Sequence, residues 1–292
     1  MLKDKSMKNL KNKVAAITGA ASGIGRALAL NLADEGCHLA ISDINEAGLQ
    51  ETADMVRSQS KNVRVTTHKV DTSDRKQVKL YAEDVMKAHC AVHIIINNAG
   101  VSIIETLEDL SYEDFEWLMG INLWGVVYGC KEFLPYLKQQ DSAHIVNISS
   151  VNGIFTNPNN GPYCTAKFAV RGFTETLAQE LANTKVKVSC VHPGGIKTNI
   201  INNARFYKVS DTSLAKEEAI AFFNRLIAKT TADKAAKIII SGIKKDKARI
   251  MVGPDAYVMD WLKRLFPVRF QKLTGRKTAP KWMRKKAGIQ RR

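Results

Sequence analysis

Tyr163 and Lys167 are the two residues whose types and spacing most directly suggest catalysis. Because they are four positions apart, they would lie on the same face of a helix. A tyrosine with a pKa of about 10 is a poor acid or base near neutrality, but a neighbouring ammonium stabilises the phenolate and lowers that pKa. The pair could then exchange a proton with an alcohol or a carbonyl oxygen. In isolation, the same spacing also fits an ordinary pair on a helix surface.

A glycine-rich segment near the N-terminus could bind phosphate groups. Thr18-Gly19-Ala20-Ala21-Ser22-Gly23-Ile24-Gly25 lies between an apolar run and a helix beginning near Arg26. Glycines allow a tight turn and a close approach to a pyrophosphate, whose charge meets the amide groups of the helix N-terminus. An ordinary strand-to-helix loop is the alternative. Its place as the first strand–turn–helix unit favours the phosphate site.

Asp43 ends the next predicted strand, 18 residues beyond Gly25. That is close to the spacing at which a carboxylate accepts hydrogen bonds from the hydroxyls of the adenosine ribose. Because its charge also repels a 2′-phosphate, we predict a preference for NAD over NADP. Asp43 could instead cap a helix starting near Asn45, which is compatible with the first role.

The elements that would hold these residues alternate short apolar runs with amphipathic stretches. Near-continuous apolar runs are typical of buried parallel strands, and the alternation implies right-handed crossovers. The sequence therefore predicts an α/β fold, a doubly wound parallel sheet in a single domain. The expected strands are 14–18, 38–42, 63–69, 92–97, 144–149, 186–192 and 249–252. The expected helices are 25–34, 46–58, 74–88, 112–137, 163–181 and 233–243.

The chain divides into three parts of different composition. We expect a basic N-terminal arm over residues 1–12, the α/β domain over 13–255 and a basic, aromatic C-terminal extension over 256–292. Residues 261–292 contain 12 Lys or Arg and no Asp or Glu. Subtracting these from the net charge of +16 leaves +4 for the first 260 residues. Since the basic residues are not spread over the folded body, we expect no nucleic-acid binding.

The five cysteines and the N-terminus bear on the compartment. The cysteines are odd in number and show no C-x-x-C or Cys/His pattern, which favours reduced thiols and predicts no metal site. The N-terminus has no apolar signal region, and no run reaches the roughly 18 apolar residues of a membrane span. We therefore expect a cytoplasmic protein.

The C-terminal extension interleaves aromatic and basic residues, from Trp261 to Trp282 and beyond. This pattern is typical of an interfacial anchor on anionic lipid, so residues 261–292 could make peripheral membrane contact. The alternative is a tail folded over a partner subunit or left in solvent. Pro267, Gly275 and Pro280 interrupt any single long helix and favour this alternative.

Four segments together resemble the motifs of the short-chain dehydrogenase/reductase family. They are the glycine-rich turn, Asn97-Asn98-Ala99-Gly100, Asn147-Ile148-Ser149-Ser150 and Tyr163-Cys164-Thr165-Ala166-Lys167, in the family's order and separations over about residues 10–255. The resemblance implies a Rossmann fold, a homodimer or homotetramer, and a nicotinamide-dependent oxidoreductase acting on a small-molecule alcohol or carbonyl substrate. Through Val252-Gly253-Pro254-Asp255-Ala256, the extension loosely resembles that of bacterial members acting on long-chain or fatty alcohols.

The resemblance also implies roles for individual residues. It implies a catalytic set of Asn122, Ser150, Tyr163 and Lys167, with Ser150 preferred to Ser149 because two residues and a glycine follow it. Lys167 would also hold the nicotinamide ribose, and Asn122 a water linking Lys167 to solvent. The implied cofactor contacts are Gly19, Ser22, Gly23, Ile24, Gly25, Asp43, Asp71, Asn98, Ala99, Gly100, Tyr163, Lys167, Pro193, Gly194, Ile196 and Thr198.

The segment over about 195–228 would set substrate choice in this family. Its candidate residues are apolar and fit a medium-chain, long-chain or cyclic substrate, or else a lid that packs on itself. They are Ile200, Ile201, Ala204, Phe206, Tyr207, Ile220, Phe222 and Phe223, with Phe155 and the rest of 151–162 as another wall. A catalytically silent cofactor-binding redox sensor is the alternative function. It would predict a broken catalytic set, whereas this one is complete.

Overall fold

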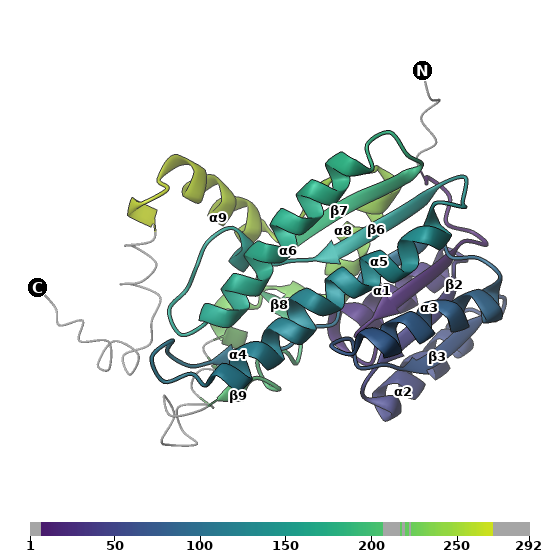
Figure 1. Cartoon of the computed structure of the whole chain (residues 1–292). Helices are drawn as coiled ribbons and strands as arrows, with labels where there is room; N and C mark the ends of the chain where they lie inside the picture. Colours follow the sequence, from purple (N-terminus) through teal and green to yellow (C-terminus); the bar gives the residue numbers. More distant parts are fainter. Residues whose placement is uncertain (1–6, 207–216, 218–219, 222, 271–292) are drawn as a thin grey trace, which may run out of the picture.

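A seven-stranded parallel sheet forms the centre of the molecule (Figure 1). The computed structural model describes residues 7–206, 217, 220–221 and 223–270. The strand order is β11-β7-β6-β4-β1-β2-β3, and every neighbouring pair runs parallel. The strands are β1 (Val14–Thr18), β2 (His38–Asp43), β3 (Val65–Lys69), β4 (Ile94–Asn97), β6 (Ala143–Ile148), β7 (Val186–Pro193) and β11 (Arg249–Val252).

Helices cover both faces of this sheet, so its central strands are buried on both sides. One hydrophobic core joins the sheet to α1 (Gly23–Asp34), α2 (Glu46–Gln59) and α8 (Ala232–Lys244). A second core joins the other face to α3 (Arg75–His89), α5 (Gly125–Leu137) and α6 (Gly161–Glu180). This arrangement confirms the predicted doubly wound α/β fold.

The order of the strands reverses at β1. The chain runs from β1 outward through β2 to β3 and then returns to place β4 on the opposite side of β1. In a parallel sheet, the two crossovers that diverge at such a point leave a crevice at the carboxyl ends of the strands, where ligands bind. The glycine-rich turn follows β1 at this crevice.

The stretch expected to be helical over 112–137 is helical from end to end, and a π-helical turn lies inside it. The observed elements are α4 (Tyr112–Met119), η1 (Gly120–Trp124) and α5. Within η1, Asn122 is buried, and its Oδ1 accepts a hydrogen bond from the Val101 N–H while its Nδ2 donates to the Val101 carbonyl, each over 2.8 Å. A π-helical turn of this kind is frequently found at functional sites.

Two pairs of short strands surround the crevice. β5 (Ile103–Ile104) pairs with β9 (Arg205–Phe206), and β8 (Ile196–Lys197) pairs with β10 (Thr230–Thr231). They tie the segment following β7 to the body of the domain.

The start of the C-terminal extension belongs to the folded body. Helix α9 (Pro254–Leu265) crosses the expected boundary at residue 255 and packs on β11 and on the 3₁₀ turn η2 (Val151–Gly153). Arg249 of β11 donates to Asp260 of α9 over 2.7 Å. Among the described residues, none of the helices has the length and apolar character of a transmembrane span. Residues 1–6 of the expected arm and 271–292 of the expected extension lie outside the described residues.

Candidate active site

A cavity of about 750 Å³ lies at the carboxyl ends of the central strands, over the point where the strand order reverses. It extends from Asp43 and Asp71, past the glycine-rich turn, to Tyr163 and Lys167. Nearly all the residues expected to contact a cofactor line it. Gly25 and the catalytic candidate Asn122 are not lining residues, since both are buried just behind the wall.

The glycine-rich turn has the shape of a cradle that larger side chains would fill. Gly19 and Gly23 have φ values of +68° and +56°, a region that favours glycine. A Cβ on Gly19 would lie 2.7 Å from the Ala99 Cα, and one on Gly25 would lie 2.1 Å from the Gly19 carbonyl oxygen. Because the backbone is bare here and α1 begins at Gly23, the turn fits the pyrophosphate of a dinucleotide.

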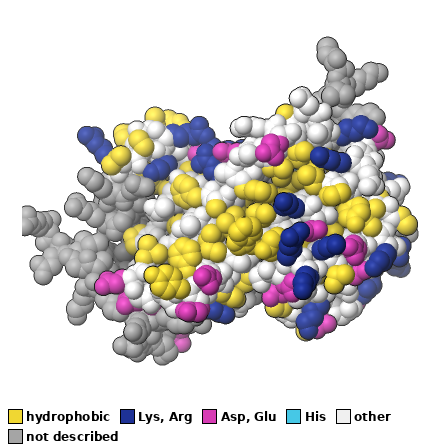
Figure 2. All heavy atoms as spheres, in the orientation of Figure 1, with side chains coloured by type: hydrophobic (Ala, Val, Ile, Leu, Met, Phe, Trp, Pro, Cys, Tyr) yellow, Lys and Arg dark blue, Asp and Glu magenta, His cyan; other side chains and the backbone are white. Residues whose placement is uncertain are grey.

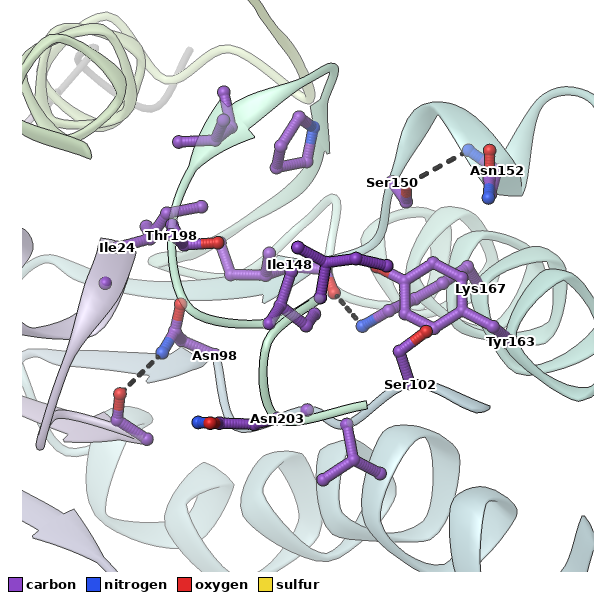
Figure 3. A pocket seen from close by; sticks show the side chains of 18 of the residues that line it. Ile24, Asn98, Ser102, Ile148, Ser150, Asn152, Tyr163, Lys167, Thr198 and Asn203 are labelled. Atoms are coloured by element: carbon purple, nitrogen blue, oxygen red, sulfur yellow. Dashed lines mark hydrogen bonds between the residues drawn. The ribbon is translucent and has the colours of Figure 1, made fainter. Parts of the chain in front are cut away.

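The side chain of Asn98 holds this turn in place. Its Nδ2 donates to the carbonyls of Thr18 and Gly19 over 2.9 and 3.0 Å, and the N–H groups of Asn98 and Ala99 donate to the Thr18 hydroxyl. In Figure 3 the Asn98 amide points toward the backbone of the turn. The segment therefore lines the cavity as expected, while the Asn98 side chain acts on the protein's own backbone.

Two carboxylates mark the far end of the cavity. Asp43 Oδ2 accepts from the Ala21 N–H over 2.9 Å, and its Oδ1 accepts from the Asn45 N–H over 3.0 Å. The helix cap itself is Asn45, whose side chain accepts from the Gly48 N–H. Asp71 Oδ1 accepts from both the N–H and the hydroxyl of Ser73. Both carboxylates are thus oriented by their neighbours while they line the cavity.

Tyr163, Ser150 and Lys167 meet at the other end (Figure 3). The Lys167 Nζ lies 5.5 Å from the centroid of the Tyr163 ring and donates to the Ile148 carbonyl over 2.9 Å. Burial lowers the pKa of Lys167 to about 8. Burial raises the pKa of Tyr163 to about 12, although a hydrogen bond with Ser150 acts in the opposite direction. This direction is opposite to the lowering expected from the neighbouring ammonium, and its largest cause is burial.

The geometry separates the roles of the two neighbouring serines. The Ser149 hydroxyl donates to the Lys167 carbonyl over 2.8 Å, so it fixes the backbone of α6. The Ser150 Oγ accepts from the Asn152 N–H over 3.1 Å and forms a hydrogen bond with Tyr163. Ser150 is thus the serine that can contact a substrate oxygen.

His192 is a residue next to Ser150 that was not expected from the sequence. It is fully buried, and its Nδ1 lies 3.0 Å from the Ser150 carbonyl oxygen. Burial lowers the pKa of His192 to about 4, so the ring is neutral at pH 7 and can donate from Nδ1 to that carbonyl. The ring therefore supports the backbone at Ser150. Its position directly before Pro193 was the available signal.

Asn122 lies behind Gly100, which separates it from the cavity near Lys167. A Cβ on Gly100 would lie 3.2 Å from the Asn122 Oδ1 and 3.7 Å from the Lys167 Nζ. The Asn122 amide is bound to the Val101 backbone on both sides. It therefore fixes the loop between β4 and β5 beside Lys167.

Apolar side chains dominate the wall beyond Tyr163. Of the residues expected from the substrate segment, Ile200, Ile201 and Phe223 line the cavity, as does Phe155 from the other expected wall. Ala204, Phe206 and Ile220 are not among the described lining residues, and Tyr207 and Phe222 lie outside the described residues. Ile227 of the same segment also lines the cavity. Further lining residues come from elements that were not expected to reach it, namely Ile104, Trp117, Ile121 and Met259.

Arg205 fastens the substrate segment to the rim of this cavity. Its guanidinium carbon lies 3.4 Å from the centroid of the Trp117 ring, and its NH1 donates to Asp114 over 2.7 Å. Its backbone N–H also donates to the Ser102 carbonyl. Because Trp117 lines the cavity, these contacts of Arg205 hold Trp117 and the substrate segment in place at the cavity wall.

Known proteins share both the sequence and the fold. A family model described as short chain dehydrogenase matches residues 13–207. SadH of Mycobacterium tuberculosis, which is named as an oxidoreductase, is 41% identical over 269 residues, covering 91% of this chain and 95% of its own. A short-chain dehydrogenase/reductase from Burkholderia phymatum, solved in complex with NAD, is 30% identical with a TM-score of 0.82, over 94% of this chain and 99% of its own.

A further solved relative carries a different nucleotide. The alcohol dehydrogenase of Thermococcus sibiricus, solved with 5-hydroxy-NADP, is 26% identical with a TM-score of 0.70, over 82% of this chain and 95% of its own. Relatives of this fold therefore include complexes with both kinds of dinucleotide.

Proposed function

The chain belongs to the short-chain dehydrogenase family, and on that premise we propose that it is a nicotinamide-dependent oxidoreductase that interconverts an alcohol and a carbonyl compound. One observation carries the proposal. The Tyr163 phenol, the Ser150 hydroxyl and the Lys167 ammonium meet at one end of a cavity whose middle is a glycine cradle. Residues for proton transfer and residues for a dinucleotide thus share one continuous space.

Tyr163, Ser150 and Lys167 have different roles in proton transfer. When bound, the nicotinamide supplies or accepts the hydride. Tyr163 donates its proton to the carbonyl oxygen in reduction, or takes the proton of the alcohol in oxidation. The Ser150 Oγ accepts from Asn152, and its hydroxyl hydrogen, which reaches Tyr163 in this structure, would turn to donate to the substrate oxygen on which charge develops. The Lys167 ammonium stabilises the phenolate that remains after Tyr163 has given up its proton.

Asp43 supports NAD as the preferred cofactor. Asp43 lines the cavity, whereas Arg26, which follows the turn, does not line it and donates to the Ala21 carbonyl and to Glu51. A hydrogen bond to a charged group contributes about 1.5–3 kcal/mol. Asp43→Ser should therefore lower the ratio of kcat/KM for NAD over NADP by roughly tenfold to a hundredfold.

The matched control for this variant is Asp54→Ser. Asp54 is an exposed carboxylate of α2 that pairs with Arg57 over 2.7 Å and does not line the cavity. Thermal unfolding of both variants checks that the loss of the Asp43 contacts to Ala21 and Asn45 has not disrupted the turn. An unchanged cofactor ratio in a folded Asp43→Ser variant would mean that other groups recognise the ribose.

The apolar wall supports a medium-chain, long-chain or cyclic apolar substrate. Each methylene buried from water contributes about 0.8 kcal/mol, or roughly fourfold in kcat/KM. We expect this gain along a series of straight-chain aldehydes, followed through the absorbance of the reduced nicotinamide, until the cavity is full. A flat series would exclude an apolar substrate site. Cofactor binding without turnover of any aldehyde, ketone or alcohol would favour the redox-sensor alternative.

We also propose that the protein forms a homodimer or homotetramer. Trp124 and Phe168 come from the adjacent elements η1 and α6, and both are exposed. Figure 2 shows hydrophobic side chains across the middle of the face where α5 and α6 lie in Figure 1. Light scattering measures the mass directly, and a monomer at working concentrations would refute this proposal.

A further inference from the structure

Helix α9 exposes a row of large apolar side chains. Tyr257, Val258, Trp261 and Leu265 lie on one side of the helix, and each is between 50% and 65% exposed. We call these four residues the α9 outer face. In Figure 2 yellow and dark blue side chains lie side by side on α9. Val268, just after the helix, is also exposed.

Both acidic residues of α9 are turned toward the protein. Asp255 accepts from the Gly195 N–H over 2.6 Å and lines the cavity. Asp260 pairs with Arg249 and Arg264 and is 18% exposed at its side chain. The basic residues Arg264 and Arg269, by contrast, are exposed. The outer face is therefore bordered by positive charge.

The positive border continues onto the neighbouring elements. Tyr257 also borders a second cavity, of about 260 Å³, between α8, β11 and α9. Basic residues contribute much of its lining, namely Lys234, Lys237, Lys247 and Arg249. Asp233 and Asp260 pair with Lys237 and Arg249. The second cavity thus has lysines in its lining beside an apolar ridge, which suits a phosphate group attached to an apolar body.

The fold holds the outer face rigidly beside the catalytic cavity. Ala256 on the inner side of α9 is fully buried, and Met259 lines the catalytic cavity. After the helix, Phe270 is buried and packs edge-on against Phe155, with 5.5 Å between the ring centroids. Since Phe155 also lines the catalytic cavity, whatever binds the outer face lies about one helix diameter, ~10 Å, from that cavity.

We propose that the α9 outer face docks on the surface of an anionic lipid membrane. Its apolar side chains reach into the boundary between headgroups and acyl chains, while the flanking Lys and Arg attract the headgroup phosphates. Two other candidates for binding the α9 outer face have charges that complement it less well. Residues 271–292 carry nine Lys or Arg and no Asp or Glu, so their charge does not complement this basic border. A second copy related by twofold symmetry would place the same basic border against itself.

The test is co-sedimentation of the full chain with vesicles of two compositions. One set is phosphatidylcholine alone, and the other is phosphatidylcholine and phosphatidylglycerol at two to one. We expect binding to the anionic vesicles only. The double variant Trp261→Glu/Leu265→Glu should bind at least about tenfold more weakly, and Arg269→Ala about fivefold more weakly, since each basic residue near the surface contributes about that factor.

The matched control is Leu80→Glu, which adds a charge at a leucine of α3 that is 55% exposed. It should bind vesicles like the unaltered protein. All variants should keep their turnover of a water-soluble substrate, which shows that they fold. Equal binding to both vesicle types, no binding to either, or equal losses in the control would overturn the proposal. So would a change of oligomeric mass in the double variant, which would make the outer face a subunit interface.

Discussion

Replacing Tyr163 by Phe separates the chemical role of this residue from its structural one. The ring packs against a small apolar cluster of Ile103, Leu118 and Ala166, and phenylalanine keeps those contacts. The change removes the phenol hydroxyl and its hydrogen bond with Ser150. One such bond contributes about 0.5–1.5 kcal/mol to stability. For a domain of this size that lowers the Tm by only a few degrees, about 2–4 °C per kcal/mol.

The expected loss of turnover is far larger. A positioned acid or base accelerates a reaction by about 10²–10⁴, equivalent to roughly 2.7–5.5 kcal/mol. Steady-state rates should therefore fall at least a hundredfold, while the affinity for the reduced nucleotide, followed by its fluorescence, changes less than about threefold.

The control for this variant is Tyr136→Phe, which removes a phenol hydroxyl from α5 outside the cavity. It should keep its full rate. Tyr163→Phe with a rate within about threefold of the unaltered protein would refute the assigned proton transfer. A loss of nucleotide binding equal to the loss of rate would mean that Tyr163 acts in binding instead.

Three further predictions follow from the geometry of the cavity. Gly25→Ala should abolish nucleotide binding measured by calorimetry, because its Cβ would lie 2.1 Å from the Gly19 carbonyl oxygen; Gly172→Ala, with nothing within 4 Å, is the control. Carbonyl reduction should slow as the pH rises through about 8, because Lys167 loses the positive charge that stabilises the phenolate, and a flat profile from pH 7 to 10 would contradict this. Arg205→Ala should raise KM for bulky substrates about fivefold or more at nearly constant kcat, because it removes the contact with Trp117 that holds the wall, whereas an unchanged KM would show that the wall stands without it.

The fold could be predicted from the sequence because the buried strands are short and nearly continuously apolar. The expected bounds of β1 and β11 match those observed, and β2 is one residue longer. The division of the helix at Gly120–Trp124 could not be predicted. It depends on a contact between Asn122 and the backbone of Val101, 21 residues away, which local periodicity does not reveal.

The residues of the candidate site were likewise predictable only in part. The residues around the glycine-rich turn and the Tyr163–Lys167 pair were predictable because their spacing along the chain is the signal. Trp117 and Met259 were missed because they reach the cavity from elements whose own sequence patterns are those of ordinary amphipathic helices. The rise in the Tyr163 pKa was not predictable, since the burial that causes it depends on the tertiary packing around the ring.

The position of β1 in the middle of the sheet has a consequence for synthesis on the ribosome. β2 can pair with one edge of β1 early, but the strand that covers the other edge, β4, follows about 80 residues later. At ~5–20 residues per second, that edge is without its partner for roughly 4–16 seconds. An apolar strand with an open edge is prone to pair with other chains. Nascent chains arrested before Ile94 should therefore bind chaperones more strongly than chains arrested after β6 has emerged, and equal binding would show that the edge is protected in another way.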